Sequence, residues 1–289
     1  MTTAKLIDGY AIAENLRAQI RLDVDVFRDR LGVAPGLDVI LVGDQAPSQI
    51  YVRNKQTACA TVGIRSTVHR LPGDVDELEL IALIKRLNVA TGVHGILIQL
   101  PLPPHLDTQK ILEVINPLKD VDGLHPYNLG RLIAGQPVLT PCTPQGCMHL
   151  ICSVLPSLSG MRATIVGRSV LVGKPLMIML MNADATVTMA HSRTCDLMQV
   201  CAQSDVLVCA IGSPGFITAD YIKPGAVVID VGINRVQQTT GEHIIRGDVD
   251  FSGALTKAGF ITPVPRGVGP MTIGYLLVNT IKAAQLQVG

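Results

Sequence analysis

A tyrosine and a lysine stand four residues apart in the segment YVRNKQT, which covers residues 51–57. On a helix this spacing places Tyr51 and Lys55 on one face, one turn apart. Both side chains can transfer protons, so the pair has the composition of an acid–base site. A solvated or purely structural pair is the alternative that this segment alone leaves open.

Three further segments carry polar or glycine-rich chemistry. Gln99 follows the apolar run VHGILI, at a point where ligands gather at the edge of an α/β sheet. The turn PLKDVDG (117–123) carries two acids, Asp120 and Asp122. The segment PVPRGVGPMT (263–272) is a glycine- and proline-rich loop that lets the backbone approach a ligand closely. These segments favour an active site over a solvated tyrosine–lysine pair.

A glycine-containing turn, IVGRSVLVGKP (165–175), stands between an expected strand and an expected helix. Dinucleotide-binding folds place their phosphate turn there, with the amides of the helix N-terminus facing the anion. The spacing of Gly167 and Gly173 departs from the G-x-G-x-x-G fingerprint, and a tight turn without a ligand is the alternative. The position of the turn at the start of a βαβ unit favours cofactor binding.

The residues after the next strand bear on the choice between NAD and NADP. An NAD site usually carries an acid there for the ribose 2′-hydroxyl, but the segment AHSRT (190–194) contains no carboxylate. Arg168, Ser169, Ser192 and Arg193 offer charge-assisted hydrogen bonds to a 2′-phosphate. We therefore expect NADP, with a solvated Arg193 as the open alternative.

Alternating apolar runs and helical patterns must position these residues. In the first half we expect strands at 37–43, 66–71 and 93–103, and helices that end near Val62 and cover 74–88. In the second half we expect helices at 143–155, 174–182 and 194–203 and strands at 162–167, 185–191, 205–212 and 225–232. Thr143 is the expected N-cap of the helix at 143–155, with Pro144 at its first position. The rhythm predicts an α/β fold with parallel sheets that helices cover on both faces.

The two series predict two α/β domains that meet near residue 140. The first, residues 1–139, carries the tyrosine–lysine pair, and the second, residues 140–270, carries the glycine turn. We expect the C-terminal helix, residues 271–289, to pack back on the first domain.

The composition, 48% hydrophobic and 16% charged, is that of a globular chain rather than a disordered one. The net charge of +1 provides no field that favours nucleic acid or an acidic membrane. No apolar window is long enough to span a bilayer, and the N-terminus lacks the apolar core of a signal peptide. We therefore expect a cytoplasmic protein.

The seven cysteines are odd in number and form no C-x-x-C motif, which favours reduced thiols over a disulfide framework. Cys142, Cys147, Cys152 and His149 invite a metal site, but the five-residue cysteine spacing matches no common zinc motif. We expect no metal site.

The order of the motifs argues against one class of dehydrogenases. Short-chain dehydrogenases also use a Y-x-x-x-K pair, but there the pair follows the dinucleotide turn within the same domain. Here Tyr51 lies far upstream of Gly167, in a separate expected domain.

Beyond these patterns, the sequence closely resembles the bifunctional methylenetetrahydrofolate dehydrogenase/cyclohydrolase family. The matching segments occur in family order and span nearly the whole chain: YVRNKQTACATVGI, GILIQLPLPPHL, PLKDVDGLHPYNLGRL, PCTPQG, VGRSVLVGKP, TVTMAHSRT, DVGINR and PVPRGVGPMT. The resemblance implies an N-terminal folate-binding catalytic domain, a Rossmann-type NADP-binding domain and a folate site in the cleft between them. It also implies a homodimer.

The implied activity has two steps and belongs to the one-carbon metabolism that serves purine biosynthesis. A hydride passes from 5,10-methylenetetrahydrofolate to NADP⁺, which gives 5,10-methenyltetrahydrofolate. Water then attacks the methenyl carbon, and ring opening gives 10-formyltetrahydrofolate. The implied partners are therefore tetrahydrofolate derivatives.

The resemblance also implies roles for single residues. Lys55 carries the proton transfer of the hydrolytic step, which requires a lysine whose pKa is lowered. Gln99 orients this lysine, Tyr51 packs along the aminobenzoyl group of the folate, and Asp122 binds the pterin edge. Asp120 is then structural. The other implied contacts are Leu100, Pro265, Gly267 and Gly269 for the folate, and Gly167, Arg168, Ser169, Ser192 and Ile233 for the cofactor.

The sequence departs from the family in its folate loop, which commonly reads PVPGGVGPMT. This chain has Arg266 where the first glycine of the pair is usual, and a non-glycine residue has a steric cost if its φ is positive. Arg266 either binds the glutamate tail of the folate or points to solvent. Cys142, in the segment PCTP, lies where the family approaches the nicotinamide, and packing is the interpretation we favour over a nucleophile.

Two other functions compete with this one. The first is a dehydrogenase for a related carrier or a small 2-keto or amino acid, which would lack the set Lys55, Gln99 and Asp122. The second is an NADP-binding sensor without catalysis, which has no need of Lys55.

Overall fold

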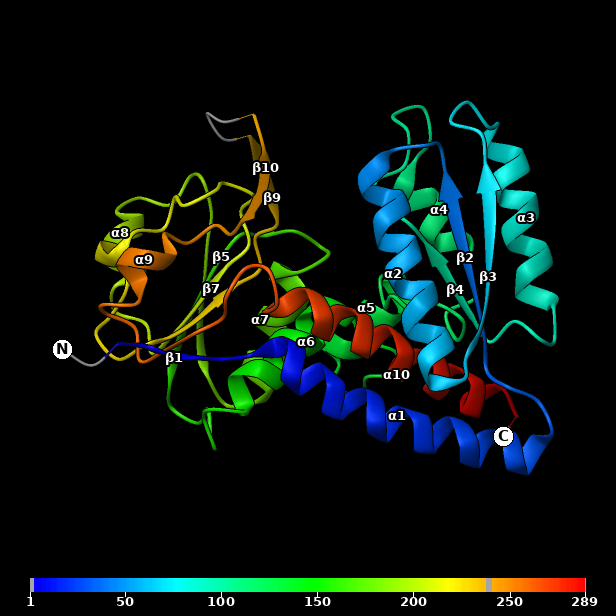
Figure 1. Cartoon of the computed structure of the whole chain (residues 1–289), viewed down its shortest axis with the longest axis horizontal. Coiled ribbons are helices and arrows are strands. Elements are labelled where there is room, and N and C mark those ends of the chain that lie inside the picture. The colour runs from blue at the N-terminus through cyan, green and yellow to red at the C-terminus, as the bar shows by residue number, and fades with distance from the viewer. Residues whose placement is uncertain (1–2, 238–240, 289) are drawn as a thin grey trace. The chain divides into compact units, whose positions relative to one another are not determined.

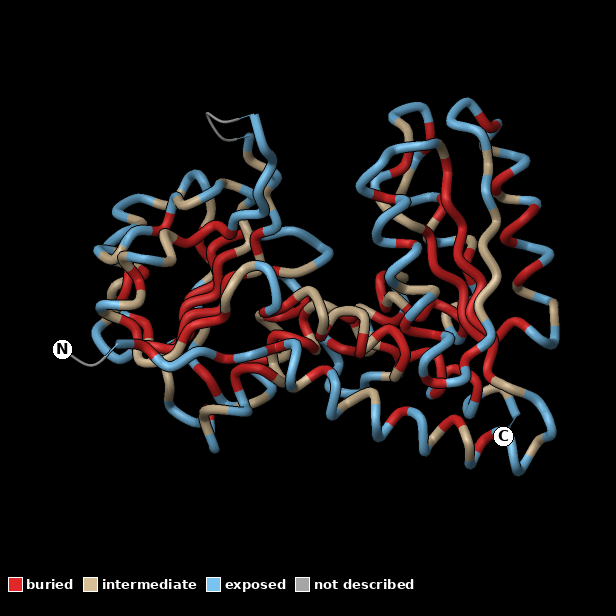
Figure 2. Tube along the Cα trace, in the orientation of Figure 1, coloured by how far each residue is buried: buried red, intermediate tan, exposed pale blue. Residues whose placement is uncertain are grey.

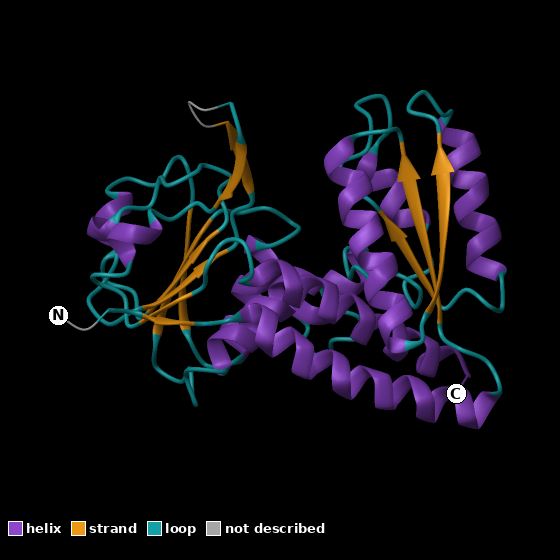
Figure 3. Cartoon of the chain, viewed as in Figure 1, coloured by secondary structure: helices purple, strands orange, loops and turns teal. Residues whose placement is uncertain are grey.

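The computed structural model describes residues 3–237 and 241–288, and the chain divides into two compact α/β units (Figures 1 and 3). The three-stranded unit consists of residues 15–142 and the residues from Ile273 onward. The six-stranded unit consists of the residues up to Glu14 and residues 143–272. The predicted fold class, two α/β domains with parallel sheets, is confirmed.

In the three-stranded unit, β2 lies between β3 and β4, and both pairings are parallel. Every residue of β2 is buried (Figure 2). In a strand, successive side chains point to opposite faces of the sheet. Val39 and Leu41 join a core with α1, α2 and α10, whereas Ile40 and Val42 join a core with α3 and α4. The elements that lie wholly or mostly in this unit are α1 (Gly9–Leu31), β2 (Gly36–Val42), α2 (Ala46–Val62), β3 (Arg65–Leu71), α3 (Glu77–Val89), β4 (Gly95–Ile98), α4 (Thr108–Val114), α5 (Pro126–Ile133) and α10 (Val268–Val288).

The six-stranded unit holds a parallel sheet in the order β1-β11-β8-β7-β5-β6. Its chain order reverses beside β5, because β6 pairs on one side of that strand and β7 on the other. The elements are β1 (Lys5–Leu6), α6 (Cys142–Cys152), β5 (Arg162–Val166), α7 (Gly173–Asn182), β6 (Thr186–Ala190), α8 (Leu197–Cys201), β7 (Val206–Cys209), η1 (Ala219–Tyr221), β8 (Val227–Asp230), β9 (Asn234–Gln237), β10 (His243–Arg246), α9 (Phe251–Ala254) and β11 (Phe260–Ile261).

The N-terminal segment departs from the expected division of the chain. Lys5 and Leu6 pair in parallel with Phe260 and Ile261, so these first residues extend the sheet of the six-stranded unit. The sequence analysis had grouped them with residues 1–139. A two-residue strand is too short to produce an alternating pattern, which is why the sequence did not indicate it.

Two helices differ from the expected elements. The helix α1, with 23 residues, was not among the expected elements, although Ile20, Val24 and Phe27 form a buried face at helical spacing. The helix α6 begins at Cys142, so the prediction of Thr143 as its N-cap is wrong. Thr143 lies inside the first turn, where its hydroxyl is 3.0 Å from the hydroxyl of Thr272.

The C-terminal helix α10 begins at Val268, three residues before the expected start. Leu276, Leu277 and Ile281 pack into the core that α1 and α2 share with the three-stranded sheet. Gly289 lies outside the described residues. Within the parts of the chain that the structure describes, no helix has both the length and the apolar character that crossing a membrane requires.

Candidate active site

Tyr51 and Lys55 lie on α2, as their spacing predicts. The helix begins with a proline in its first turn and ends at Gly63, whose φ of 83° is the left-handed conformation that glycine adopts at helix ends. Tyr51 is 37% exposed, and partial burial raises the pKa of its phenol above the ordinary value. The phenol is therefore protonated at neutral pH and offers a ring and a hydroxyl to a ligand.

Gln99 fixes the position of the Lys55 ammonium. Lys55 Nζ donates a hydrogen bond to Gln99 Oε1 over 3.1 Å. The backbone of Gln99 is held by β2, because its N–H donates to the carbonyl of Ile40 at 2.9 Å. Its Nε2 donates to the carbonyl of Leu100 at 2.8 Å, and this bond orients Oε1 towards the lysine. The end of β4 thus presents a fixed acceptor to Lys55.

Lys55 and Asp122 influence each other through burial and charge. Burial lowers the pKa of Lys55, and the negative charge of Asp122 opposes that shift. Burial raises the pKa of Asp122, and the positive charge of Lys55 opposes that shift. In both groups desolvation outweighs the mutual attraction, which brings the two pKa values closer together. Lys55 is therefore able to gain and lose a proton more readily than an exposed lysine.

The turn that carries Asp122 is held by residues from distant parts of the chain. Val121 accepts hydrogen bonds on its carbonyl from Cys142 Sγ at 3.2 Å and from Asn279 Nδ2 at 2.8 Å. Burial raises the pKa of the Cys142 thiol well above its ordinary value. Cys142 is thus a buried, protonated packing residue. The sequence analysis missed Asn279, because its position on α10 carries no local signal for a contact with Val121.

Asp120 has a different environment from Asp122. It is fully buried and accepts hydrogen bonds from the backbone N–H of His125 and from Asn128 Nδ2, each at 2.8 Å. These bonds tie the turn to the start of α5. Its oxygens thus face a backbone N–H and a buried amide, and the structural role of Asp120 stays a prediction.

The predicted cofactor residues follow neighbouring strands of the six-stranded sheet. Gly167 follows β5, Ser192 follows β6 and Ile233 follows β8. Because these strands are parallel, their carboxyl ends lie at the same edge of the sheet. This edge includes the point beside β5 where the strand order reverses, which is where open α/β sheets bind dinucleotides.

The glycine turn itself has no room for side chains. Gly167 has a φ of 125°, and a Cβ atom there would lie 2.2 Å from the carbonyl oxygen of Ala210. A Cβ atom on Gly173 would lie 2.1 Å from the carbonyl oxygen of Gly167. Both glycines therefore permit close packing of β5, β7 and α7. Ser169 Oγ accepts a hydrogen bond from the N–H of Val172 at 3.1 Å and closes the turn before α7.

The side chains around this turn fit a dinucleotide that carries a 2′-phosphate. Arg168, Ser169, Ser192 and Arg193 are exposed, and the segment that directly follows β6 carries no carboxylate. The N–H of Arg193 donates to His191 Nδ1 at 3.2 Å, which folds this segment into a turn. Cationic and hydroxyl groups around a glycine turn match the charge and hydrogen-bonding needs of phosphate groups.

Arg266 adopts a left-handed backbone conformation, with a φ of 86°. Its guanidinium carbon lies 5.0 Å from the ring centre of Tyr10, and one guanidinium nitrogen lies 3.5 Å from Asp8 Oδ2. Asp8 in turn accepts hydrogen bonds from the N–H groups of Tyr10 and Ala11 at the start of α1. The Arg266 side chain is 62% exposed and contacts residues at and just before the start of α1, and binding of the glutamate tail of the folate stays a prediction.

The remaining predicted folate residues, Pro265, Gly267 and Gly269, lie in the loop around Arg266 and at the start of α10. A Cβ atom on Gly267 would lie 2.5 Å from the carbonyl oxygen of Pro263, so this position accepts only glycine. A Cβ atom on Gly269 would lie 3.9 Å from Ile233 Cδ1. The structure thus brings one predicted folate residue next to one predicted cofactor residue.

The predicted residues fall into two groups. Lys55, Gln99 and Asp122 are brought together in the three-stranded unit, with Tyr51 one turn from Lys55 on α2. The cofactor residues and the loop of Arg266 belong to the six-stranded unit.

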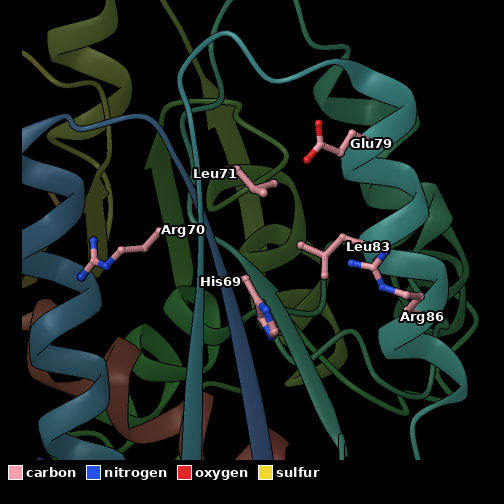
Figure 4. A pocket seen from close by; sticks show the side chains of 6 residues that line it. All are labelled: His69, Arg70, Leu71, Glu79, Leu83 and Arg86. Carbon is pink, nitrogen blue, oxygen red and sulfur yellow. The ribbon is translucent and has the colours of Figure 1, made fainter.

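A separate pocket of about 290 Å³ lies in the three-stranded unit and contains none of the predicted residues (Figure 4). His69 and Leu71 of β3 point towards α3, whereas Arg70 points away from it. His69 Nε2 lies 2.8 Å from Asp38 Oδ2, so one ring nitrogen is already committed to a buried carboxylate. The complete lining is His69, Arg70, Leu71, Glu79, Leu83 and Arg86.

Comparisons with known proteins match both halves of the chain to one family. Residues 7–122 match the family described as tetrahydrofolate dehydrogenase/cyclohydrolase, catalytic domain. Residues 141–288 match the NAD(P)-binding domain of the same family.

Individual relatives match along almost their whole length. Bifunctional protein FolD 2 of Pseudomonas putida (strain GB-1) is 54% identical over 99% of this chain and 94% of its own length. The crystal structure of the bifunctional enzyme FolD from Campylobacter jejuni has a TM-score of 0.93 and 43% identity, covering 98% of this chain and 99% of its own. The FolD of Trypanosoma brucei, complexed with NADP cofactor and inhibitor, has a TM-score of 0.95 and 40% identity, covering 100% of this chain and 99% of its own.

Proposed function

The chain belongs to the tetrahydrofolate dehydrogenase/cyclohydrolase family, and from this premise we propose a two-step activity with NADP as cofactor. The enzyme oxidises 5,10-methylenetetrahydrofolate to 5,10-methenyltetrahydrofolate and hydrolyses this product to 10-formyltetrahydrofolate. The observation that carries the proposal is the Lys55–Gln99 hydrogen bond, 3.1 Å long, together with the charge of the half-buried Asp122 that acts on Lys55. This arrangement suits proton transfer, which the second step requires and a simple NADP-binding protein does not.

For the first step, NADP⁺ accepts the hydride when it is bound. The contribution of this chain is to hold the cofactor at the glycine turn between β5 and α7, where backbone amides face its phosphates. Arg168 and Ser192 bind the 2′-phosphate, and Ser169 closes the turn. Gly167 and Ile233 complete the proposed cofactor contacts.

For the second step, Lys55 moves the proton. Neutral Lys55 removes a proton from the water that forms a C–O bond with the methenyl carbon. As the carbonyl forms, the bond from this carbon to N5 breaks and the hydroxyl proton is released. Lys55 returns its proton to N5, so the net products are 10-formyltetrahydrofolate and one proton. Burial, which lowers the pKa of Lys55, makes the neutral form accessible.

The neighbouring residues bind and orient the folate. Gln99 directs the Lys55 nitrogen through the bond between Nζ and Oε1. Asp122 accepts N–H groups of the pterin edge, and Tyr51 packs along the aminobenzoyl ring. The contacts of Leu100, Pro265, Gly267 and Gly269 with the folate stay predictions.

We also propose a cytoplasmic homodimer that supplies one-carbon units for purine biosynthesis, on the strength of the family resemblance and the bacterial relatives. Light scattering of the purified protein at micromolar concentration measures its molar mass. A mass equal to one chain contradicts the dimer.

The decisive experiment follows the absorbance of the protein mixed with 5,10-methylenetetrahydrofolate and either NADP⁺ or NAD⁺. Acid quenching separates the NADPH signal from that of the methenyl product, which absorbs in the same region. We expect NADPH to form with NADP⁺, without accumulation of the methenyl product. Accumulation shows a dehydrogenase that lacks the second step, and tight NADPH binding without turnover of any folate supports the sensor instead.

A further inference from the structure

A fully buried carboxylate, Asp248, gathers four hydrogen-bond donors in the six-stranded unit. Its Oδ2 accepts from the N–H groups of Ile211 and Gly212, at 2.7 and 3.1 Å. Its Oδ1 accepts from the N–H of Ser213 and from Asn234 Nδ2, both at 2.9 Å. A carboxylate with four donors has its acceptor positions filled, so Asp248 does not itself contact a ligand.

A second buried carboxylate, Asp230, holds Asp248 in place. Asp230 accepts from the N–H groups of Gly232, Asp248 and Val249 over 2.9 to 3.0 Å. The packing is tight, because a Cβ atom on Gly232 would lie 2.4 Å from the carboxyl carbon of Asp248. The two acids therefore form one rigid network that links the end of β8 to residues 211–213.

The segments that this network fixes lie on one side of the cofactor turn. Residues 211–213 follow β7 after one intervening residue, and Asn234 follows Ile233 after β8. In the sheet, β7 and β8 lie on one side of β5, and β6 lies on the other. In dinucleotide-binding sheets the pyrophosphate sits at the turn after the first strand and the adenosine ribose at the end of the second, here β5 and β6. The nicotinamide half of the cofactor therefore extends over the segments after β7 and β8.

From these contacts we infer that Asp248 is a positioning residue for the nicotinamide half of NADP. It acts through the backbone of residues 211–213 and through Asn234, which it holds beside Ile233. This inference rests on the proposed function, because it takes the glycine turn as an NADP site. The adenosine half binds at β6 and the glycine turn, which Asp248 does not contact through these bonds.

The test compares two ligands that share the adenosine half of the cofactor. NADPH binding is followed by fluorescence titration, and binding of adenosine 2′,5′-bisphosphate, which lacks nicotinamide, is followed by calorimetry. In Asp248→Asn the amide group turns one acceptor into a donor that faces backbone N–H groups. We expect NADPH affinity to fall about tenfold or more and affinity for the bisphosphate to change less than about twofold.

Two further variants keep the test decisive. Asp250→Asn, two residues away at the start of α9, is the matched control, and we expect it to bind both ligands like the wild type. Asn234→Ala removes one donor and is a milder change in case Asp248→Asn does not fold. We expect it to weaken NADPH about two- to fivefold, with the bisphosphate unaffected.

The outcomes separate the inference from the proposed function. Selective loss of NADPH affinity in either variant supports the positioning role. Unchanged NADPH affinity in Asn234→Ala and in folded Asp248→Asn, or equal losses for both ligands, overturns it while the proposed function stands. A wild-type protein that binds the bisphosphate and NADPH equally weakly overturns both.

Discussion

Replacing Lys55 with methionine is the most direct test of the proposed chemistry. Methionine has a similar length and fills the same space, but it has no group that accepts or donates a proton. It also cannot form the 3.1 Å hydrogen bond that Lys55 donates to Gln99. General acid–base catalysis contributes about 10²- to 10⁴-fold, which corresponds to about 3–5 kcal/mol of barrier at 1.36 kcal/mol per tenfold change in rate. We expect Lys55→Met to lose this factor in the hydrolytic step.

The assay follows the near-ultraviolet absorbance of preformed 5,10-methenyltetrahydrofolate as the enzyme hydrolyses it. Affinities for NADPH and for a folate ligand are measured separately and should stay within a few fold of the wild type. Lys85→Met, the same substitution at an exposed position of α3, is the control and should hydrolyse like the wild type. Hydrolysis by Lys55→Met at the wild-type rate refutes the role of Lys55.

The pH dependence of the hydrolytic rate provides a second test of the role of Lys55, because the direction of its change can be predicted. Water is deprotonated by neutral Lys55, so the hydrolytic rate rises as pH increases through the lowered pKa of Lys55. The charge of Asp122 holds this pKa up, and Asp122→Asn removes that charge. The rising limb of the pH profile should therefore move to lower pH in Asp122→Asn, even though folate affinity falls. A limb that stays in place contradicts the electrostatic coupling of the two residues.

Three further predictions concern the six-stranded unit. Arg168→Ala should weaken NADP⁺ binding about 10- to 100-fold and NAD⁺ binding much less, since a charge-assisted bond to the 2′-phosphate is lost; equal losses in a binding titration contradict this role. Arg266 has a φ of 86°, which glycine adopts without the steric cost that alanine has there. Arg266→Gly should therefore be more stable to thermal denaturation than Arg266→Ala by about 1 kcal/mol. Equal stabilities of the two variants mean that the backbone relaxes. Burial raises the pKa of Asp230 from 3.8 to about 6. Between these two pH values the native state binds one proton more than the unfolded state does. The free energy of unfolding therefore falls by about 3 kcal/mol as pH rises through this window. Denaturation of Asp230→Asn across the same pH range should lack this loss, and an identical pH dependence assigns the titration to another group.

The fold was predictable where local patterns are long and regular. The strand β2 and the helix α3 lie within a few residues of their expected limits, because apolar runs and helical periodicity reflect burial directly. The first strand was not predictable, since Lys5 and Leu6 become a strand only through pairing with Phe260 and Ile261. For α1, the helical spacing of Ile20, Val24 and Phe27 reflects the buried face of the helix.

The candidate site was predictable to a different degree. Spacing alone placed Tyr51 and Lys55 on one helical face, but the contact of Lys55 with Gln99 joins residues 44 positions apart and entered only through the family resemblance. Asn279 and Asp248 had no comparable signal, because their roles consist of hydrogen bonds to backbone groups that sequence does not identify. Residues that act on a site by holding its backbone are thus the ones that sequence patterns reveal least.

The proposed roles of Lys55 and Asp122 favour opposite protonation states of Lys55. Hydrolysis requires neutral Lys55, while the charge of Asp122, which recognises the pterin, favours the protonated lysine. On the proposed function, folate itself relieves this conflict, because pterin N–H groups that donate to Asp122 spread its charge and weaken its hold on the lysine proton. At the same time the folate excludes water from Lys55, which lowers the pKa of Lys55 further. Neutral Lys55, the form that the hydrolytic step requires, is therefore most populated when the substrate is bound, and recognition and proton transfer are coupled through a single carboxylate.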